Sequence, residues 1–271
     1  MKVKILTLLI ALTVLASSIT ACTPKNSYLI QVMKIAPINT DVVSCVDIEA
    51  LAEDPDFDSM YSEIINSLSY ELLDDFGLED IVISAISAFA TVESVRGSIF
   101  VLVGDFNLED VRDTLEYYYF VESEYRRVEI WTDDFEYTIA FIDNMIVLGN
   151  KDTVEVCIRI HGNEESSMYD NEDMKSVADK LPAGVISMVF GPDYLYDIEI
   201  LAGGICLRNL TSGDEVWDMN GWLRFDSAAS AEAAMEDIED NLSWELDATN
   251  IDAHLSGQFI EFSGEIEIPD Y

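Results

Sequence analysis

Residues 98–142 read SIFVLVGDFNLEDVRDTLEYYYFVESEYRRVEIWTDDFEYTIAFI, and this stretch contains the patterns from which the fold is predicted. Apolar residues dominate 98–104, which is typical of a buried strand. Asn107 can then cap a helix, and the apolar face of that helix is formed by Leu108, Val111, Leu115 and Tyr118. The segments 127–132 and 136–142 are again β-like. The stretch therefore predicts a strand, a helix and two further strands.

The same order recurs near the end of the chain, in residues 215–268. A strand at 215–225 precedes a helix that Ser227 can cap, and two strands follow at 250–255 and 258–268. The last strand alternates apolar with mostly acidic residues, so one of its faces packs on a core and the other faces water. We therefore expect an α+β fold of two β-α-β-β units, with a mostly antiparallel sheet and helices packed on one side.

The rest of the chain supplies further elements of the same kinds. Strands are expected at 42–48, 88–95, 145–149, 185–190 and 198–208, and helices at 57–76, 80–86, 152–160 and 171–181. Asp152 and Glu155 suit a capping box for the third of these helices. We expect an N-terminal α+β unit at 37–190 and a C-terminal unit at 191–271, which can share one sheet.

The N-terminus has the pattern of a bacterial lipoprotein leader. A basic start precedes an apolar run at 5–15, and residues 19–22 (ITAC) form a lipobox. The apolar run is too short for a membrane-spanning helix, and small residues before the cysteine suit a signal peptidase. We expect residues 1–21 to be a signal peptide, Cys22 to carry the lipid, and residues 22–36 to form a tether.

This leader predicts an exported protein that a lipid holds at the cell membrane, facing the exterior or the periplasm. The bilayer is thus one expected partner. The later apolar stretch 185–206 is no second anchor, because it contains Asp193, Asp197 and Glu199.

The net charge is extreme. Once the two leader lysines are removed, 12 basic residues face 53 acidic ones, a formal charge of −41 over 250 residues. Such a field repels nucleic acid and anionic headgroups, so no nucleic-acid partner is expected. The acidity suits either a high-salt surface or attraction of cations and basic partners. Hydrophobic residues make up 49% of the sequence, which excludes a disordered acidic chain.

The cysteine and histidine residues show no clear pattern of a catalytic or metal-binding site. Cys45, Cys157 and Cys206 each lie among apolar residues and match no metal spacing, so we interpret them as small core residues. One disulfide among them is an open alternative. A Cys157–His161 pair could approach on a helix, but a buried thiol beside a helix-end histidine is the favoured interpretation.

Other motifs are weak. Residues 54–58 (DPDFD) begin like a calcium loop but lack its glycine and its final glutamate, so they are interpreted as a helix start. Asn209 and Asn241 fit the N-glycosylation acceptor pattern. We expect no catalytic residue, no bound metal and no cofactor, since no catalytic or nucleotide-binding motif is present.

The order of several short motifs resembles a group of exported bacterial or archaeal lipoproteins that is known only as a domain of unknown function. The motifs are Pro37-x-x-Thr40-Asp41, Val46–Leu51, Ile142–Gly149, Gly162–Ser167 and Asp179–Pro182. They cover most of residues 37–190. The resemblance implies a duplicated α+β architecture and no known activity.

These observations favour a membrane-anchored, non-catalytic module outside the cytoplasm, which binds a small ligand or an envelope protein. The alternative is a substrate- or cation-binding lipoprotein that serves a transporter, which would need a ligand-sized pocket. A hydrolase that uses paired carboxylates is the weakest alternative, because 53 acidic residues make any chosen pair uninformative.

Overall fold

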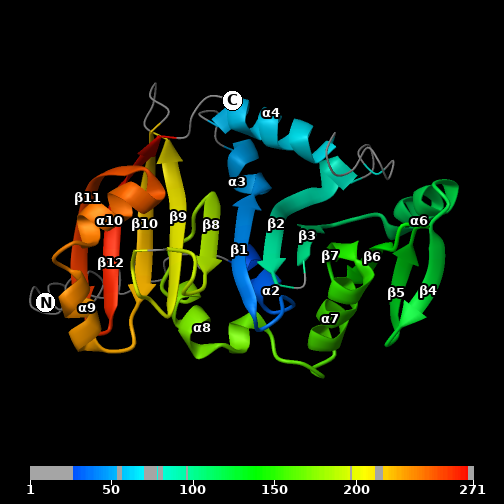
Figure 1. The fold of residues 1–271 in the computed structure, drawn as a ribbon. Helices are drawn as coiled ribbons and strands as arrows, with labels where there is room; N and C mark the ends of the chain where they lie inside the picture. Colours follow the sequence, from blue (N-terminus) through cyan, green and yellow to red (C-terminus); the bar gives the residue numbers. More distant parts are fainter. Residues whose placement is uncertain are drawn as a thin grey trace, which may run out of the picture.

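Twelve strands form one antiparallel sheet in the computed structural model, and helices pack against it (Figure 1). The structure describes residues 27–53, 57–69, 78, 82–95, 97–195, 197–210 and 216–267. The predicted signal peptide, Cys22 and residues 54–56 of the calcium-like stretch lie outside these residues.

The strand order across the sheet is β11-β12-β10-β9-β8-β1-β2-β3-β7-β6-β5-β4. The strands are β1 (Thr40–Asp47), β2 (Ile86–Ser94), β3 (Gly97–Gly104), β4 (Val121–Tyr125), β5 (Val128–Thr132), β6 (Tyr137–Ile142), β7 (Met145–Asn150), β8 (Ile186–Phe190), β9 (Ala202–Leu210), β10 (Val216–Arg224), β11 (Ala248–Ser256) and β12 (Phe259–Glu267). The helices are α2 (Ser27–Met33), α3 (Ile48–Glu53), α4 (Asp58–Ser67), α6 (Leu108–Tyr117), α7 (Lys151–His161), α8 (Glu172–Ala178), α9 (Ala228–Ala234) and α10 (Ile238–Leu246). Two short 3-10 turns are η4 (Ile83–Ala85) and η5 (Met168–Asp170). The predicted α+β class with an antiparallel sheet is confirmed.

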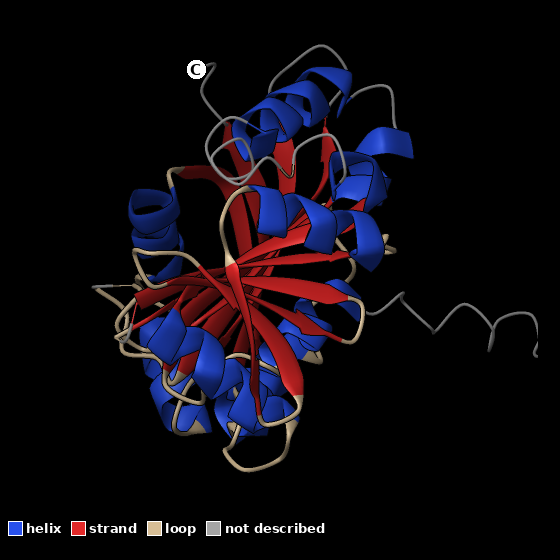
Figure 2. Ribbon diagram, turned by 90° about the vertical axis from the view of Figure 1, so that its right-hand side faces the viewer, coloured by secondary structure: helices blue, strands red, loops and turns tan. Residues whose placement is uncertain are grey.

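Helices cover both faces of the sheet, whereas the sequence led us to expect them on one side (Figure 2). One core packs under α3, α6 and α10, and the other under α2, α7 and α8. The reason lies in the central strands, whose apolar residues are consecutive. In β7, Ile146 and Leu148 enter the first core, while Met145 and Val147 enter the second. A strand that is apolar on both sides needs cover on both sides.

The sheet consists of two similar halves that meet at the β1–β8 pair. In each half, three consecutive antiparallel strands come first, and a helical crossover then carries the chain to the edge of the sheet. The strands after the crossover pair from that edge inward, until the last of them pairs with the third of the first strands. The crossover is α6 in the first half and α9 with α10 in the second. We call the β1–β8 pair the seam; its register aligns Val42 with Phe190 and Val46 with Ile186. The predicted order of strand, helix and returning strands recurs in both halves, but four strands follow α6 in the first half and two follow α10 in the second.

Residues 27–36 are folded onto the sheet, so this part of the expected tether is corrected. They form α2 and the turn that follows it, and Leu29, Val32 and Met33 are completely buried in the second core. The apolar spacing of these three residues places them on one helical face. Only 22–26 of the expected tether lie before the folded domain.

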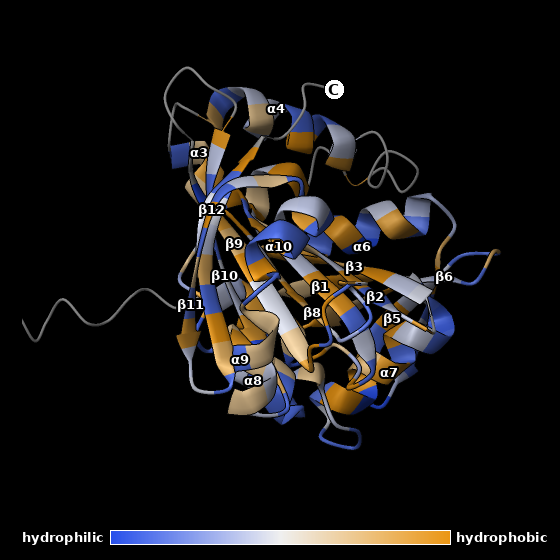
Figure 3. Cartoon of the chain, turned by 60° about the vertical axis from the view of Figure 1, so that its left-hand side comes forward, coloured by the Kyte–Doolittle hydropathy of each residue, from blue (hydrophilic) through white to orange (hydrophobic). Residues whose placement is uncertain are grey.

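The elements differ from the sequence prediction in several places. Strand β4 was not predicted, because its residues are almost all exposed and lack an apolar face. The last predicted helix is two helices, α9 and α10. Asn150, and not Asp152, caps α7 by accepting a hydrogen bond from Thr153 N at 2.9 Å. Figure 3 shows the resulting pattern, with apolar colour along strands such as β3 and mixed colours on α6 and α7.

A charged contact joins α6 to β5, the strand next to one edge of the sheet. Arg112 donates two hydrogen bonds to the Glu129 carboxylate, at 2.7 and 2.9 Å, and Trp131 Nε1 donates a third at 2.8 Å. These bonds, chiefly those of Arg112, lower the pKa of Glu129 below its usual value, although partial burial opposes them. A carboxylate with a lowered pKa stabilises the fold when it is ionised.

We expect Glu129→Gln to lower the free energy of unfolding by about 1 kcal/mol at pH 7, because solvent screens the partly exposed pair. The contribution is present above the unfolded-state pKa of about 4.3 and is lost as the pH falls through the lower folded-state pKa. Urea unfolding at pH 7 and at pH 3 should therefore show a difference between parent and variant that shrinks in acid. The exposed Glu232→Gln is the control and should change stability by less than about 0.5 kcal/mol. An undiminished difference at pH 3 would contradict the charge argument.

Candidate functional site

The residues singled out in the sequence are distributed over the fold and do not form one site. The backbone of Asn209 belongs to β9, but its side chain and Thr211 of its acceptor motif lie outside the described residues. Asn241 lies on α10, and the hydroxyl of Ser243 in its motif donates to Ala248 O at 2.7 Å. Glycosylation of either asparagine stays a prediction.

The three cysteines in the described part of the chain are buried and not disulfide-bonded. Burial raises the pKa of the Cys157 thiol to about 12 and that of Cys206 to about 11, and it raises the pKa of Cys45 further. A thiol that stays protonated is a poor nucleophile and metal ligand. Their interpretation as small apolar core residues is confirmed.

Cys157 and His161 do not form a catalytic pair. Cys157 packs in the second core and is completely buried. His161 lies at the end of α7, where its Nδ1 is 3.7 Å from Asp143 Oδ2 and its side chain is 37% exposed. A nucleophile needs its base within hydrogen-bond reach, and here the two groups lie in different environments.

A metal centre is not evident in the residues that the structure covers, since they contain no cluster of three or more histidine, cysteine or acidic side chains suited to holding an ion. Of the calcium-like stretch 54–58, residues 54–56 lie outside them, and Asp58 begins α4. Within the same residues, no helix combines the length and the apolar character needed to cross a bilayer.

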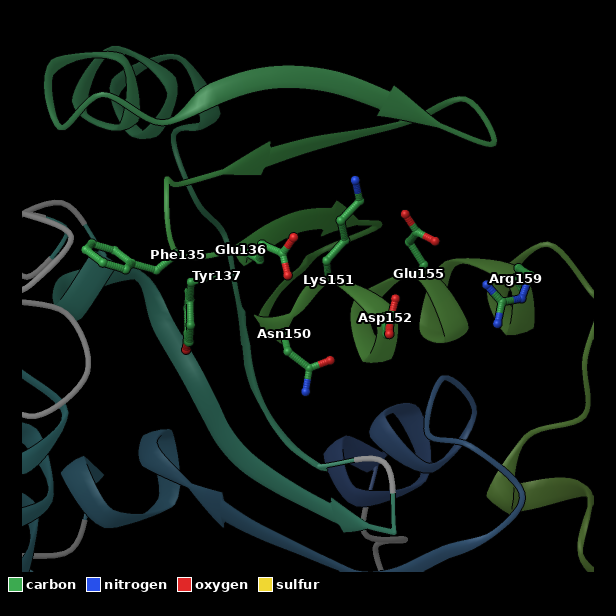
Figure 4. A pocket seen from close by; sticks show the side chains of 8 residues that line it. All are labelled: Phe135, Glu136, Tyr137, Asn150, Lys151, Asp152, Glu155 and Arg159. Carbon is green, nitrogen blue, oxygen red and sulfur yellow. The ribbon is translucent and has the colours of Figure 1, made fainter.

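A wide cavity of about 940 Å³ lies beside the start of α7 (Figure 4). Its walls carry charges of both signs, and the lining residues are Phe135, Glu136, Tyr137, Asn150, Lys151, Asp152, Glu155 and Arg159. Several of these side chains already have structural partners. Arg159 donates to Glu165 at 2.6 Å and to Tyr125 at 3.0 Å, and Asn150 caps the helix. Burial raises the pKa of Tyr137 to about 12, so this phenol stays protonated. The cavity is therefore a weak candidate for a ligand site.

A second cavity, of about 470 Å³, lies at one end of the seam, and we call it the seam pocket. Three strand ends build it: β1 begins there, whereas β2 and β8 end there. A β-bulge at Asp41 interrupts the pairing of β1 with β2, and Gly191 N donates to Asp41 O at 2.8 Å. Its lining residues are Ile38, Asn39, Thr40, Asp41, Val42, Glu93, Val95, Asn171, Met174, Gly191, Pro192, Asp193 and Tyr194.

One lining residue of the seam pocket, Thr40, is almost completely buried. Its side chain is 3% exposed, and its Oγ1 is the one buried side-chain polar atom without a hydrogen-bond partner among the described residues. An unpaired buried hydroxyl costs about 1–3 kcal/mol, so such groups are rare and call for an explanation. The other buried threonines are bonded; Thr138, for example, lies 3.1 Å from the Thr132 hydroxyl.

The rim of the seam pocket is both apolar and acidic. Ile38, Val95 and Tyr194 belong to the exposed large hydrophobic residues, at 45%, 78% and 41% exposure. Burial, and to a lesser degree the charge of Glu93, raises the pKa of Tyr194. The ring of Tyr194 stacks on Phe190 at 4.5 Å between centroids, which fixes the aromatic wall to the core.

Sequence reasoning did not find this pocket. Its walls come from segments near residues 40, 93, 171 and 192, which only the tertiary fold brings together. The one available signal was the Thr40-Asp41 pair just before the predicted first strand, and it was interpreted as part of a structural motif.

Comparison with known proteins gives a likeness of fold. No protein-family model matches the chain, and no curated protein sequence does. Solved structures of TP0453, a membrane-associated protein of Treponema pallidum, are similar to it. Crystal form I gives a TM-score of 0.52 at 10% identity, over 87% of this chain and 92% of that chain. Crystal form III gives 0.50 at 9% identity, over 87% and 93%. At identities this low, the likeness shows a shared fold and nothing more. The sequence resemblance to exported lipoproteins of unknown function stays a prediction.

Proposed function

We propose that this protein is a lipid-anchored binding module that works outside the cytoplasm, without catalysis, through its seam pocket. The observation that carries the proposal is the 470 Å³ seam pocket itself, whose wall joins the buried Val42 and Met174 to apolar side chains at an exposed rim. That volume is within the range of small-molecule sites, which are lined mainly by apolar side chains with a few polar groups. The fold that the chain shares with a treponemal membrane-associated protein supports an envelope location.

Anchoring is supported by the lipobox and by the short distance from it to the domain. Helix α2 begins at Ser27, five residues after Cys22. A fully extended chain spans about 3.5 Å per residue, so the anchor keeps the domain within about 18 Å of the lipid surface. A module held this closely suits capture of a ligand near the membrane. Service to a transporter is the second candidate, and the ligand-sized pocket favours it.

The anchor is tested by Cys22→Ser. We expect the parent protein to sediment with membranes and to be extracted only by detergent, because two acyl chains give stable attachment. The variant should be soluble or retain its leader. Mass spectrometry of the processed N-terminus is the direct measurement. A variant that fractionates like the parent contradicts the anchor.

Binding at the seam pocket is tested by a screen of small molecules for ligands that raise the melting temperature of the protein. Binding to the folded state alone raises this temperature. Val95→Trp, at the rim, should remove the effect of every such ligand by filling the pocket. Leu255→Trp is the matched control, because Leu255 is an exposed residue on edge strand β11. Ligands that stabilise the Val95→Trp protein as well as the parent bind elsewhere and contradict the proposed site.

A further inference from the structure

We propose that strand β4 accepts an extended segment of a partner protein, which adds to the sheet as a further strand and carries lysine or arginine at alternate positions. This surface is separate from the seam pocket, so the inference goes beyond the proposed function. Strand β4, which we call the open edge, ends the sheet beside β5, and no described strand lies on its outer side (Figure 1).

The open edge offers backbone groups to an incoming strand. All five of its residues pair with β5 in an unbroken register. Arg126 and Arg127 both have positive φ and form the two-residue turn between these strands, so the residues on either side of the turn exchange hydrogen bonds. Bonded and non-bonded pairs alternate along an antiparallel ladder, which leaves the N–H and C=O groups of Glu122 and Glu124 pointing away from β5. A peptide that extends a sheet pairs with groups of this kind.

The opposite edge of the sheet is less suited to such pairing. In β11, the pairing with β12 shifts register between Thr249 and Asp252, and Asn250 between them has a positive φ. A bulge of this kind twists an edge strand and interrupts the regular row of backbone groups that another chain would need. Strand β4 contains no such interruption, so of the two edges it is the one that can continue the sheet.

Exposed aromatic side chains lie at the start of the open edge. Tyr117, Tyr119 and Val121 are 77%, 87% and 65% exposed. The ring of Tyr118 contacts that of Tyr117 edge to face, at 5.4 Å between centroids. We call these four residues the tyrosine rim. Tyr119 also has a φ of 67°, at the position after a helix where glycine is preferred. Adjacent apolar side chains that remain in water, one of them on a strained backbone, are typical of a contact surface.

The side chains of the open edge select a basic partner. Glu122 and Glu124 lie on the same face of the sheet, because they are two residues apart in a strand. A residue directly opposite either of them in an added strand lies about 5.5 Å away between Cα atoms, so lysine or arginine there is attracted and an acid is repelled. Arg112 does not supply this charge itself, since Glu129 holds its guanidinium through two hydrogen bonds.

The same rule argues against a second copy of this chain as the occupant. In a symmetric antiparallel pairing of two β4 strands, centred on Ser123, Glu122 of each strand would lie opposite Glu124 of the other. Like charges that face each other directly destabilise a strand pair. The open edge is therefore protected against its own copies, while a strand with basic residues two positions apart fits it.

The test uses a six-residue peptide, Thr-Lys-Thr-Lys-Val-Phe, blocked at both ends and labelled with an uncharged dye. In antiparallel register its lysines lie opposite Glu124 and Glu122, and its phenylalanine reaches the tyrosine rim. Binding is measured by fluorescence anisotropy with the full mature chain in detergent micelles and 150 mM NaCl, where screening weakens attraction to the overall negative charge. The control peptide Lys-Lys-Thr-Thr-Val-Phe has the same composition and charge without the alternation, and it should bind at least about tenfold more weakly.

Backbone methylation of the peptide separates strand addition from attraction between charges. In the expected register, the N–H groups of the two lysines point toward the open edge, and those of the two threonines point away from it. Methylating both lysine amides should abolish binding, because it removes the backbone donors and leaves the charges in place. Methylating both threonine amides should have little effect. Equal losses from the two modifications would overturn strand addition.

Variants of the protein locate the peptide. Glu122→Gln with Glu124→Gln should weaken the alternating peptide at least about tenfold. Glu232→Gln with Glu239→Gln removes the same charge from exposed positions on α9 and α10, and it should have little effect. Tyr119→Gly should weaken binding several-fold and raise the melting temperature of the free protein, because glycine adopts a positive φ without strain.

The remaining outcomes each decide one claim. An alternating peptide that binds no more tightly than its control would show general attraction to an acidic protein and would overturn the inference. Equal losses in the two charge-removal pairs would overturn the local role of Glu122 and Glu124. Val95→Trp, which fills the seam pocket, should leave peptide binding unchanged. A loss in that variant would place the peptide in the seam pocket and overturn the open edge, while the proposed function would stand.

Discussion

Gly203→Ala is expected to lower the free energy of unfolding by about 3 kcal/mol, the upper end of the usual cost of overpacking a core. Gly203 in β9 lies directly across from Phe190 in β8. A β-carbon added at Gly203 would stand 2.2 Å from Cε2 of the Phe190 ring, closer than any real contact. Phe190 is completely buried, so the ring has no solvent to move into. Gly221 and Phe262 repeat the arrangement in the β10–β12 pair, with a closest approach of 2.1 Å.

Urea unfolding of parent and variant measures the effect, and Gly162→Ala is the matched control. At Gly162, the added β-carbon meets only ordinary contacts, at 3.5 Å from Ile158 O and 3.6 Å from Arg159 O. Its backbone also suits alanine, so stability should be unchanged or rise by about 0.5 kcal/mol. Equal effects at Gly203 and Gly162 would contradict the packing argument.

The same glycine connects the core to the seam pocket. A displaced Phe190 ring disturbs Tyr194, because the two rings are stacked 4.5 Å apart. Gly203→Ala should therefore also weaken ligands of the seam pocket, whereas destabilising changes far from Phe190 should not. The fold and the proposed site are thus coupled through one aromatic contact.

Local patterns in the sequence were sufficient to predict most of the strands and the antiparallel class of the sheet. The alternation in 258–268 and the cap at Ser227 predicted β12 and the start of α9, and both are present. These signals depend on neighbours within one element, which is why they can be recognised without a tertiary structure.

The layer arrangement required information that periodicity does not contain. A continuous apolar run such as β7 is compatible with burial on both faces of the sheet. The run does not indicate which helices pack on each face. Strand β4 was missed for the opposite reason, since Val121 and Glu122 are exposed and its pairing with β5 alone defines it. The seam pocket depends on a β-bulge and on strand ends that are distant in the chain, and a single sequence shows neither of them.

Trp217→Ala is expected to lower the free energy of unfolding by about 4 kcal/mol, a typical cost for removing a large buried aromatic side chain. Trp217 in β10 is 1% exposed, and its ring stacks on Phe57 at 4.9 Å between centroids and 22° between planes. Phe57 immediately precedes α4, a helix without a fully buried residue. The contact therefore attaches α4 to the second half of the sheet, and its loss should release the helix as well as leave a cavity.

Two measurements separate these effects. Urea unfolding gives the change in stability, and limited proteolysis under native conditions should show earlier cleavage within 58–67 in the variant, because local opening exposes the chain to protease. Trp244→Ala is the control: Trp244 is 81% exposed on α10, so its removal should change stability by less than about 0.5 kcal/mol. Loss of stability without faster cleavage of α4 would show that Trp217 contributes volume to the core and does not hold the helix. Similar losses at Trp217 and Trp244 would contradict the burial argument itself, since the two residues differ chiefly in their contact with water.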